Sequence, residues 1–349
     1  MSNKARQKIG SQHIGAGEMP IFLPDIDVYF KHDIEGAYRL VNELSALGVT
    51  TLKGAILHDA EICLPGGDTG YFVPGEGVRT ENYRQVIDRH VVPLETFRRI
   101  YSDARDRGLD LVLSVYDEPG IALALELGSA ALKIPSSNIT HAPLIRDAAS
   151  AGLPLIIDTG RSTMDEIRRA VGWARASGVE VLIIEHSPPG PPAPVSAFNL
   201  NMMTALGEEY DCFDGLSDHF MGIDMMLVAT ARGADVIEKG VCLDRTESDI
   251  DIAHALPISQ VGPALEKMGL FHQSLGARER VLPSDRPLPP DRMCVVAAVD
   301  LPAGTPITRN NIRFAFPPLG IGSEHWDRLE GAAVKKFVPA GQPLQDNDV

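Results

Sequence analysis

Residues 213–243 read FDGLSDHFMGIDMMLVATARGADVIEKGVCL and contain the alternation that decides the fold. Two short runs, 213–219 and 236–243, predict strands. Between them, residues 221–232 have apolar side chains at helical spacing and end before Gly233, the residue type that commonly follows a helix. The stretch therefore predicts a strand–helix–strand unit.

The same alternation recurs from about residue 20 to residue 275. We expect strands at Ile21–Ile26, Thr51–Ile56, Leu111–Tyr116, Ala130–Pro135, Leu155–Thr159, Val181–His186, Phe213–His219 and Val236–Leu243. The helical patterns between them include Glu35–Leu47, Leu94–Asp106, Met164–Ala176 and Met221–Arg232. Such alternation predicts an α/β protein with a (β/α)8 TIM barrel. A doubly wound sheet is the competing fold, but its Gly-rich dinucleotide loop does not follow the first strand.

Composition changes after the barrel pattern. Residues 277–291 include the run ERVLPSDRPLPPD, which is typical of an interdomain linker. We therefore predict one domain over residues 1–276 and a small second domain over residues 292–349. The second domain contains two similar phrases, LPAGTPI from Leu301 and VPAGQPL from Val338, and we expect it to be β-rich with one short helix around Arg309–Ile312.

Charge and composition restrict the class of partner. The formal net charge of −15 repels nucleic acid and anionic membranes, so we expect neither nucleic acid nor a membrane as a partner. The four cysteines show no metal-binding spacing, and the N-terminal residues lack the apolar core of a signal peptide. No apolar run reaches membrane-spanning length. These features predict a cytoplasmic protein with free thiols.

Polar residues stand at the C-terminal ends of the predicted strands, where a (β/α)8 barrel has its active site. They are Lys53, Ser114, Lys133 with Ser136, Asp158, Glu185-His186, Ser217-Asp218-His219 and Glu238. A buried lysine is costly unless it pairs with an anion. Two lysines beside serine hydroxyls predict a pocket for a small phosphorylated carboxylate. The alternative is that each lysine pairs with a neighbouring Asp or Glu.

The segment from Leu57 to Val92 is longer than an ordinary connection between a strand and a helix. Long segments of this kind are often functional lids, and a passive surface insertion is the equally weighted alternative.

Several phrases in the chain resemble the N-acetylneuraminate (sialic acid) synthase family, which includes homologues of the spore coat polysaccharide biosynthesis type. The resemblance rests on Gly215-Leu-Ser-Asp-His219-Phe-Met-Gly222, Val236-Ile-Glu-Lys239, Lys133-Ile-Pro-Ser136 and Lys53. It implies a barrel followed by an antifreeze-like (SAF) domain, whose phrases those of the second domain resemble. It also implies a domain-swapped homodimer, in which the small domain of each subunit caps the barrel of the other.

The same resemblance implies condensation of phosphoenolpyruvate with an amino-sugar or related aldehyde. The product would be a nonulosonic-type 2-keto-3-deoxy acid for surface polysaccharide biosynthesis. A divalent metal, Mn or Mg, would be held by His219 and would polarise the aldehyde. Asp251, Glu238 and His186 are the catalytic candidates. The substrate-binding candidates are Lys53, Ser114, Lys133, Ser136, Asp158, Arg161 and Ser217.

Some positions depart from the family pattern. Gly240 stands where a second metal-ligating His is expected, and Phe316 stands where an Arg contacts the substrate. Asp158 would repel a phosphate unless Arg161 neutralises it. Two further hypotheses therefore stay open. One is lyase or epimerase chemistry in the same barrel, and the other is a non-catalytic binding homologue that has lost the metal site.

Overall fold

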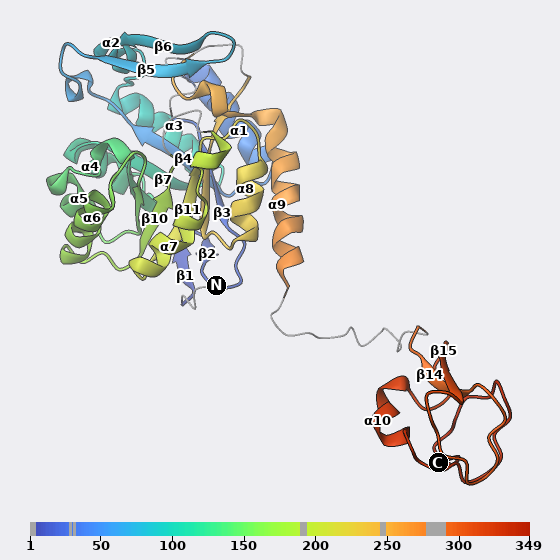
Figure 1. Cartoon of the computed structure of the whole chain (residues 1–349). Coiled ribbons are helices and arrows are strands. Elements are labelled where there is room, and N and C mark those ends of the chain that lie inside the picture. The colour runs from blue at the N-terminus through green and yellow to red at the C-terminus, as the bar shows by residue number, and fades with distance from the viewer. Residues whose placement is uncertain (1–4, 28–29, 31–32, 189–193, 245–248, 277–290) are drawn as a thin grey trace. The chain divides into compact units, whose positions relative to one another are not determined.

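The computed structural model describes residues 5–27, 30, 33–188, 194–244, 249–276 and 291–349. The chain divides into two compact units, residues 1–276 and residues 277–349, both drawn in Figure 1. The expected linker, 277–291, lies outside the described residues except for Asp291.

Eight parallel strands form a closed barrel in the first unit. They are β3 (Ile21–Asp25), β4 (Thr51–Ile56), β7 (Asp110–Val115), β8 (Ala131–Ile134), β9 (Leu155–Asp158), β10 (Leu182–His186), β11 (Phe213–Asp218) and β12 (Val236–Cys242). Each strand pairs with the next along the chain, and β12 closes the ring by pairing with both β11 and β3. The expected (β/α)8 barrel is confirmed, and the predicted strands agree with these to within one or two residues at either end.

Helices surround the barrel, as Figure 1 shows. They are α1 (Ile34–Ala46), α3 (Leu94–Asp106), α4 (Glu118–Glu126), α5 (Ala142–Ala149), α6 (Met164–Ala176), α7 (Asn201–Glu209), α8 (Asp224–Ala231) and α9 (Val261–Leu275). Helix α3 shows why they pack there, because Phe97, Ile100, Tyr101 and Ala104 recur at helical spacing and are all buried. Tyr101 approaches so closely that a Cβ atom on Gly54 would lie 2.3 Å from its hydroxyl oxygen.

Apolar side chains fill the barrel interior below the C-terminal ends of the strands, toward the N-terminal hairpin. They come from the strands and from the antiparallel hairpin of β1 (Gln7–Ile9) and β2 (Gln12–Ile14): Ile9, Ile14, Ile21, Leu23, Val112, Ala131, Ile156, Ile183, Phe213 and Val236. This packed interior leaves the C-terminal ends of the strands as the place where polar side chains can meet a cavity.

The long segment after β4 contains secondary structure of its own. It forms the antiparallel pair β5 (Asp68–Val73) and β6 (Gly77–Asn82), followed by the short helix α2 (Tyr83–Asp88). Figure 1 shows this insertion at the end of the barrel unit opposite the chain's N-terminus.

The second unit has its own apolar core, which includes Val295, Leu301, Ile307, Val338 and Leu344. Strands β14 (Cys294–Ala297) and β15 (Ile312–Ala315) pair antiparallel, and the short helix α10 spans Trp326–Leu329. The prediction of a helix around Arg309–Ile312 is therefore wrong. The Asn311 side chain accepts from the Thr308 amide at 2.8 Å and donates to the Pro306 carbonyl at 3.0 Å, and these bonds stabilise a turn instead.

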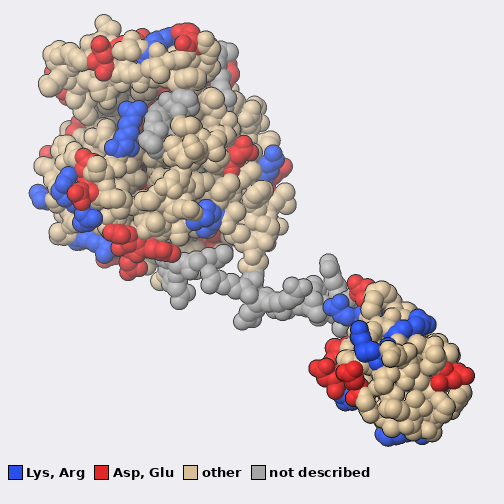
Figure 2. All heavy atoms as spheres, viewed as in Figure 1, with Lys and Arg blue, Asp and Glu red and all other residues tan. Residues whose placement is uncertain are grey.

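On the face that Figure 2 shows, basic side chains lie among acidic ones over the described part of the barrel unit. Among the described helices, none combines the length and apolar character that crossing a membrane requires.

Ile156 is a suitable test of the barrel interior because it is fully buried there, on β9. We expect Ile156→Ala to lower the free energy of unfolding by about 2–5 kcal/mol, measured by urea denaturation, because it removes apolar burial and leaves a cavity. Val228→Ala on the outer side of α8, where Val228 is 41% exposed, should change it by less than about 0.5 kcal/mol. Equal effects of the two variants would contradict a packed barrel interior.

Candidate functional site

The strand register brings polar residues together at the C-terminal ends of the barrel strands. Residues directly opposite each other on neighbouring strands include Asp25 and Lys53, Ser114 and Lys133, Asp158 and Glu185, and Ser217 and Glu238. Residues opposite each other on neighbouring parallel strands point to the same side of the sheet, so these side chains form a ring around the C-terminal mouth of the closed barrel.

The ring borders a cavity of about 170 Å³. Nine of the predicted site residues line it: Lys53, Ser114, Lys133, Ser136, Asp158, Ser217, His219, Glu238 and Asp251. The two remaining predicted residues, His186 and Arg161, are absent from the described lining. Residues far apart in the sequence thus meet at one place.

Lys133 lies at the centre of the ring and contacts three carboxyl groups. Its Nζ atom is 2.6 Å from Glu185 Oε2, 2.6 Å from Glu238 Oε1 and 3.2 Å from Asp158 Oδ2. Burial alone would lower the pKa of Lys133, but these three carboxylates outweigh it and raise the pKa well above its usual range. The Lys133 amine therefore stays protonated and does not act as a nucleophile.

Lys53 has a similar environment on the other side of the ring. Its Nζ atom lies 2.8 Å from Asp25 Oδ2, 3.7 Å from Asp27 Oδ2 and 4.0 Å from Glu238 Oε1. Both lysines are thus paired with carboxyl groups, which is the alternative that the sequence left open for them. Glu238 is shared between the two lysines and links the two halves of the ring.

The carboxyl groups of the ring differ in their affinity for protons. Burial raises the pKa of Glu185 to about 8 and that of Asp25 to about 7, although the adjacent lysine opposes the shift in each case. Burial would also raise the pKa of Asp158 and Glu238, but there Lys133 outweighs it and lowers both. The ring therefore holds both a stored proton and firmly ionised carboxylates near neutral pH.

Three buried polar atoms of the lining have no hydrogen-bond partner among the described residues: Ser114 Oγ, Glu238 Oε2 and His219 Nδ1. A buried polar atom without a partner costs free energy unless a bound molecule satisfies it. These atoms are therefore available to a ligand in the cavity.

The cavity has donor types that suit a divalent metal near His219. The Nδ1 atom of His219 is an unpartnered imidazole donor, and Asp158 and Asp251 interact with His219 electrostatically, but these three residues do not form a group whose ligand atoms all lie within 4.8 Å of one another. A second group, Asp158, Glu185 and Glu238, has oxygens within 4.8 Å of one another. The Lys133 ammonium already lies among those oxygens, so this second group does not fit a metal while Lys133 stays in place.

His186 and Arg161 lie away from the cavity lining. His186 follows the ring on β10, but its Nε2 atom lies 2.6 Å from the carbonyl oxygen of Phe198, and burial lowers its pKa. Arg161 is exposed and has a left-handed backbone, with φ of 54°. The carboxylate of Asp158 instead forms an ion pair with Lys133 and accepts a hydrogen bond from the Gly160 amide at 2.8 Å.

Three polar residues that line the cavity, Asp25, Asp27 and Tyr116, were not named as polar strand ends or site residues from the sequence. Glu185 and Asp218 were named among the polar strand ends but not as candidate site residues; Asp218 lines the cavity, and Glu185 contacts Lys133. A signal for them was available, because Asp25, Tyr116, Glu185 and Asp218 end predicted strands or lie one residue from such an end. Asp27 also lies one residue beyond the end of its predicted strand, Ile21–Ile26, and two residues beyond the observed end of β3.

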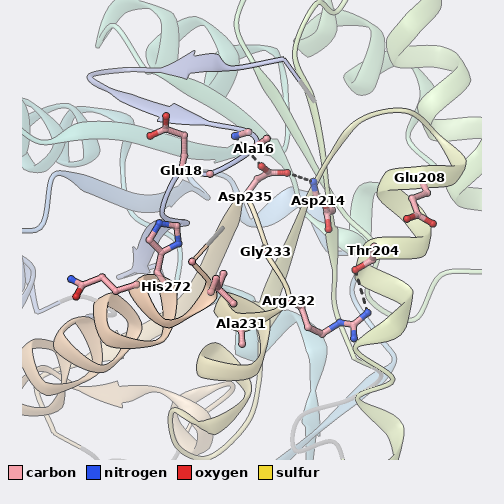
Figure 3. Close-up of a pocket in the computed structure, with 15 residues that line it drawn as sticks. Ala16, Glu18, Thr204, Glu208, Asp214, Ala231, Arg232, Gly233, Asp235 and His272 are labelled. Carbon is pink, nitrogen blue, oxygen red and sulfur yellow. Dashed lines mark hydrogen bonds between the residues drawn. The ribbon is translucent and has the colours of Figure 1, made fainter. Parts of the chain in front are cut away.

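A larger hollow, of about 610 Å³, lies at the opposite ends of the strands. Figure 3 shows Asp235 there, on the loop between α8 and β12. Asp235 accepts from the amides of Gly15 and Asp214, each at 3.0 Å, and so fixes the segment after the β1–β2 hairpin to the bottom of the barrel. Residues at this face of a (β/α)8 barrel serve stability rather than chemistry.

The cavity at the strand ends can be compared with known proteins. The chain is 29% identical over 248 residues to an N,N'-diacetyllegionaminic acid synthase of Legionella pneumophila, which covers 69% of each protein. It is 24% identical to a pseudaminic acid synthase of Helicobacter pylori, over 95% of this chain and 98% of the relative. A putative spore coat polysaccharide biosynthesis protein E of Chromobacterium violaceum has the same fold, with a TM-score of 0.73 at 21% identity, over 94% of this chain and 99% of that structure.

Family models match both parts of the chain. The SAF domain model matches residues 292–349, which form the small β-containing unit. The NeuB family model matches residues 43–280, more than half of the chain, including all barrel strands after β3. With the closed barrel, the ring at its strand ends and the SAF domain in place, the chain belongs to the NeuB family.

Proposed function

We propose that this protein condenses phosphoenolpyruvate with an amino-sugar or related aldehyde, as a transferase of the sialic acid synthase type. One observation carries the proposal. Lys53, Lys133, Ser136 and Ser217, the residues expected to contact phosphoenolpyruvate, line a single cavity together with His219. The relatives named as legionaminic and pseudaminic acid synthases support the same reaction class.

In this proposal the two lysines exchange carboxylate partners for the anionic groups of the substrate. Lys53 and Lys133 would bind the phosphate and carboxylate of phosphoenolpyruvate, with hydroxyl groups of Ser114, Ser136 and Ser217 donating to their oxygens. The third carbon of the enolpyruvate would attack the aldehyde carbon, water would add to the second carbon, and phosphate would leave. The product is a nonulosonic-type 2-keto-3-deoxy acid for surface polysaccharide biosynthesis.

Residues of the cavity lining would also transfer protons during the reaction. Glu238 and Asp251 line the cavity and would give or accept protons during addition of the aldehyde and of water. His186, which lies outside the lining, would act only through a neighbour. A Mn or Mg ion held by His219 with Asp158 and Asp251 would supply a Lewis acid for the aldehyde oxygen.

The domain boundaries and the assembly belong to the same proposal. We propose a barrel domain over residues 1–276, a linker over 277–291 and an antifreeze-like domain over 292–349. The linker would allow a domain-swapped homodimer, in which each small domain caps the partner's barrel.

Calorimetric titration of the Mn-loaded protein with phosphoenolpyruvate tests the proposal directly. We expect micromolar binding to the full chain, and no detectable binding to Lys133→Ala, because that variant loses the central cation. Circular dichroism of Lys133→Ala would show whether it folds, since its three carboxylates lose their shared partner. Absence of binding to the wild-type protein, with and without Mn, would overturn phosphoenolpyruvate as the donor.

Two adjacent serines provide a milder, matched comparison. Ser136 lines the cavity, whereas Ser137 is absent from the lining and donates to the Asn138 side chain at 2.8 Å. We expect Ser136→Ala to weaken phosphoenolpyruvate binding about tenfold, the value of one hydrogen bond to a charged group, and Ser137→Ala to change it less than about twofold. Equal effects in the same titration would place the substrate elsewhere.

The binding of an anion to this ring should depend on pH. As pH rises from about 6 to about 9, Asp25 and Glu185 lose protons around their raised pKa values of about 7 and about 8, and the ring becomes more negative. Phosphoenolpyruvate should therefore bind more weakly at the higher pH. Glu185→Gln, which cannot ionise, should remove the part of this dependence near pH 8, and a dependence unchanged in that variant would contradict the assignment.

One observation favours a second candidate function. The cavity lining contains six carboxyl groups, Asp25, Asp27, Asp158, Asp218, Glu238 and Asp251, but only two lysines, both paired. This excess of negative charge suits an uncharged substrate better than a phosphorylated one. The matching reaction is lyase or epimerase chemistry by Glu238 and Asp251, and metal binding without phosphoenolpyruvate binding would favour it.

A further inference from the structure

Asp251 reaches the cavity from a loop rather than from a barrel strand. It lines the cavity, and its backbone is left-handed, with φ of 64°. Residues other than glycine adopt this conformation uncommonly, although Asp does so more often than most, and contacts that fix the loop would favour it. The residues after it form a short turn, in which the amide of His254 donates to the Asp251 carbonyl at 3.3 Å.

Asp249, two residues earlier, anchors this loop. Its side chain is 1% exposed and accepts from the Ile250 amide at 2.8 Å. The Arg89 guanidinium binds this carboxylate in a bidentate manner, with Nε 3.0 Å from Oδ2 and Nη2 2.8 Å from Oδ1. His90 adds a contact of 3.5 Å between Nε2 and Oδ2. Burial would raise the pKa of Asp249, but these partners lower it well below its usual range, so the carboxylate stays ionised.

Arg89 belongs to the insertion between β4 and α3 rather than to the barrel ring. It follows helix α2, and its Nη2 atom also lies 2.6 Å from Glu81 Oε2 on β6. Tyr71 on β5 donates to the same Glu81 oxygen at 2.8 Å. A planar, bidentate pair of this kind fixes orientation as well as distance, which a single contact does not do. The insertion is therefore tied to the loop that carries Asp251.

We propose that the Arg89–Asp249 pair is a positioning device that holds Asp251 in its left-handed conformation at the cavity. Arg89 and Asp249 do not touch the substrate; they act through Asp251. The consequence for ligand binding rests on the proposed function, whereas the geometric coupling between the insertion and the loop does not. The insertion thereby serves as a fixed support of the site, which is neither a swinging lid nor a passive surface extension.

A double-mutant cycle tests whether the pair acts through Asp251. We expect Arg89→Gln and Asp249→Asn each to weaken phosphoenolpyruvate binding to the Mn-loaded full chain about tenfold, and Arg89→Lys to recover part of the loss. In an Asp251→Asn background the same changes should have less than about a twofold effect, because the residue through which they act is already lost. Effects that multiply in the double variants would overturn the proposal.

Arg84 provides the matched control. It lies in α2, five residues before Arg89, and pairs with Glu61 at 2.8 Å and Asp88 at 2.9 Å, both within the insertion. Arg84→Gln should therefore leave binding unchanged, although it removes ion pairs from the same helix. Weakening by Arg84→Gln equal to that by Arg89→Gln would show a general loosening of the insertion and would overturn the proposal.

Hydrogen exchange separates this inference from the proposed function. If the wild-type protein binds no phosphoenolpyruvate, the proposed donor fails, but the coupling remains measurable. Backbone amides of residues 249–256 should exchange about tenfold faster in Arg89→Gln than in the wild-type protein or in Arg84→Gln. Unchanged exchange in this segment would overturn the coupling, whatever the protein binds.

Discussion

The ammonium group of Lys133 is the interaction on which the site depends. It lies within 3.2 Å of carboxyl oxygens from β9, β10 and β12, so one charge joins three strands to its own strand, β8. Leaving a buried carboxylate without its partner costs about 3–5 kcal/mol, whereas a well-paired cluster is close to neutral for stability. The cluster therefore specifies the arrangement of the barrel mouth more than it adds to the stability of the barrel.

This cluster also decides what the cavity can bind. An anionic substrate must replace carboxylates around Lys133 and Lys53, and the displaced charge must be neutralised by protons or by a cation. Asp25, whose pKa is raised to about 7, can take up such a proton near neutral pH, and Glu185, whose pKa is raised to about 8, can do so at slightly higher pH. The proposed anion binding would thus be linked to proton uptake in this barrel. Asp158 is tolerated at the cavity because Lys133, rather than Arg161, neutralises it.

The fold could be predicted because its signals are local. Each barrel strand is a short apolar run, and helices such as α3 repeat buried residues at helical spacing, so neither depends on distant parts of the chain. The lining of the cavity was largely predictable for the same reason, since most of its residues end strands. The ion pairs were not predictable, because Lys133 meets Glu238 across 105 residues only after β12 has closed the ring. The second unit shows a different limit, since the turn at Asn311 is local but depends on hydrogen bonds of one side chain, which a weak helical pattern does not reveal.

The position of Asp251 shows how an insertion outside the barrel ring can set a residue inside the cavity. A left-handed backbone at a residue other than glycine costs up to about 1–3 kcal/mol, and Asp251 lies on a loop rather than on a barrel strand whose pairing would fix its backbone. The offset comes from Asp249, whose carboxylate is held by Arg89 and His90 of the insertion and by the amide of Ile250. The strands therefore fix the charges of the ring, while the insertion fixes Asp251, a carboxylate that enters the cavity from a loop. Changes in the insertion can thus alter the position of Asp251 in the cavity without disturbing Lys133 and its three partners.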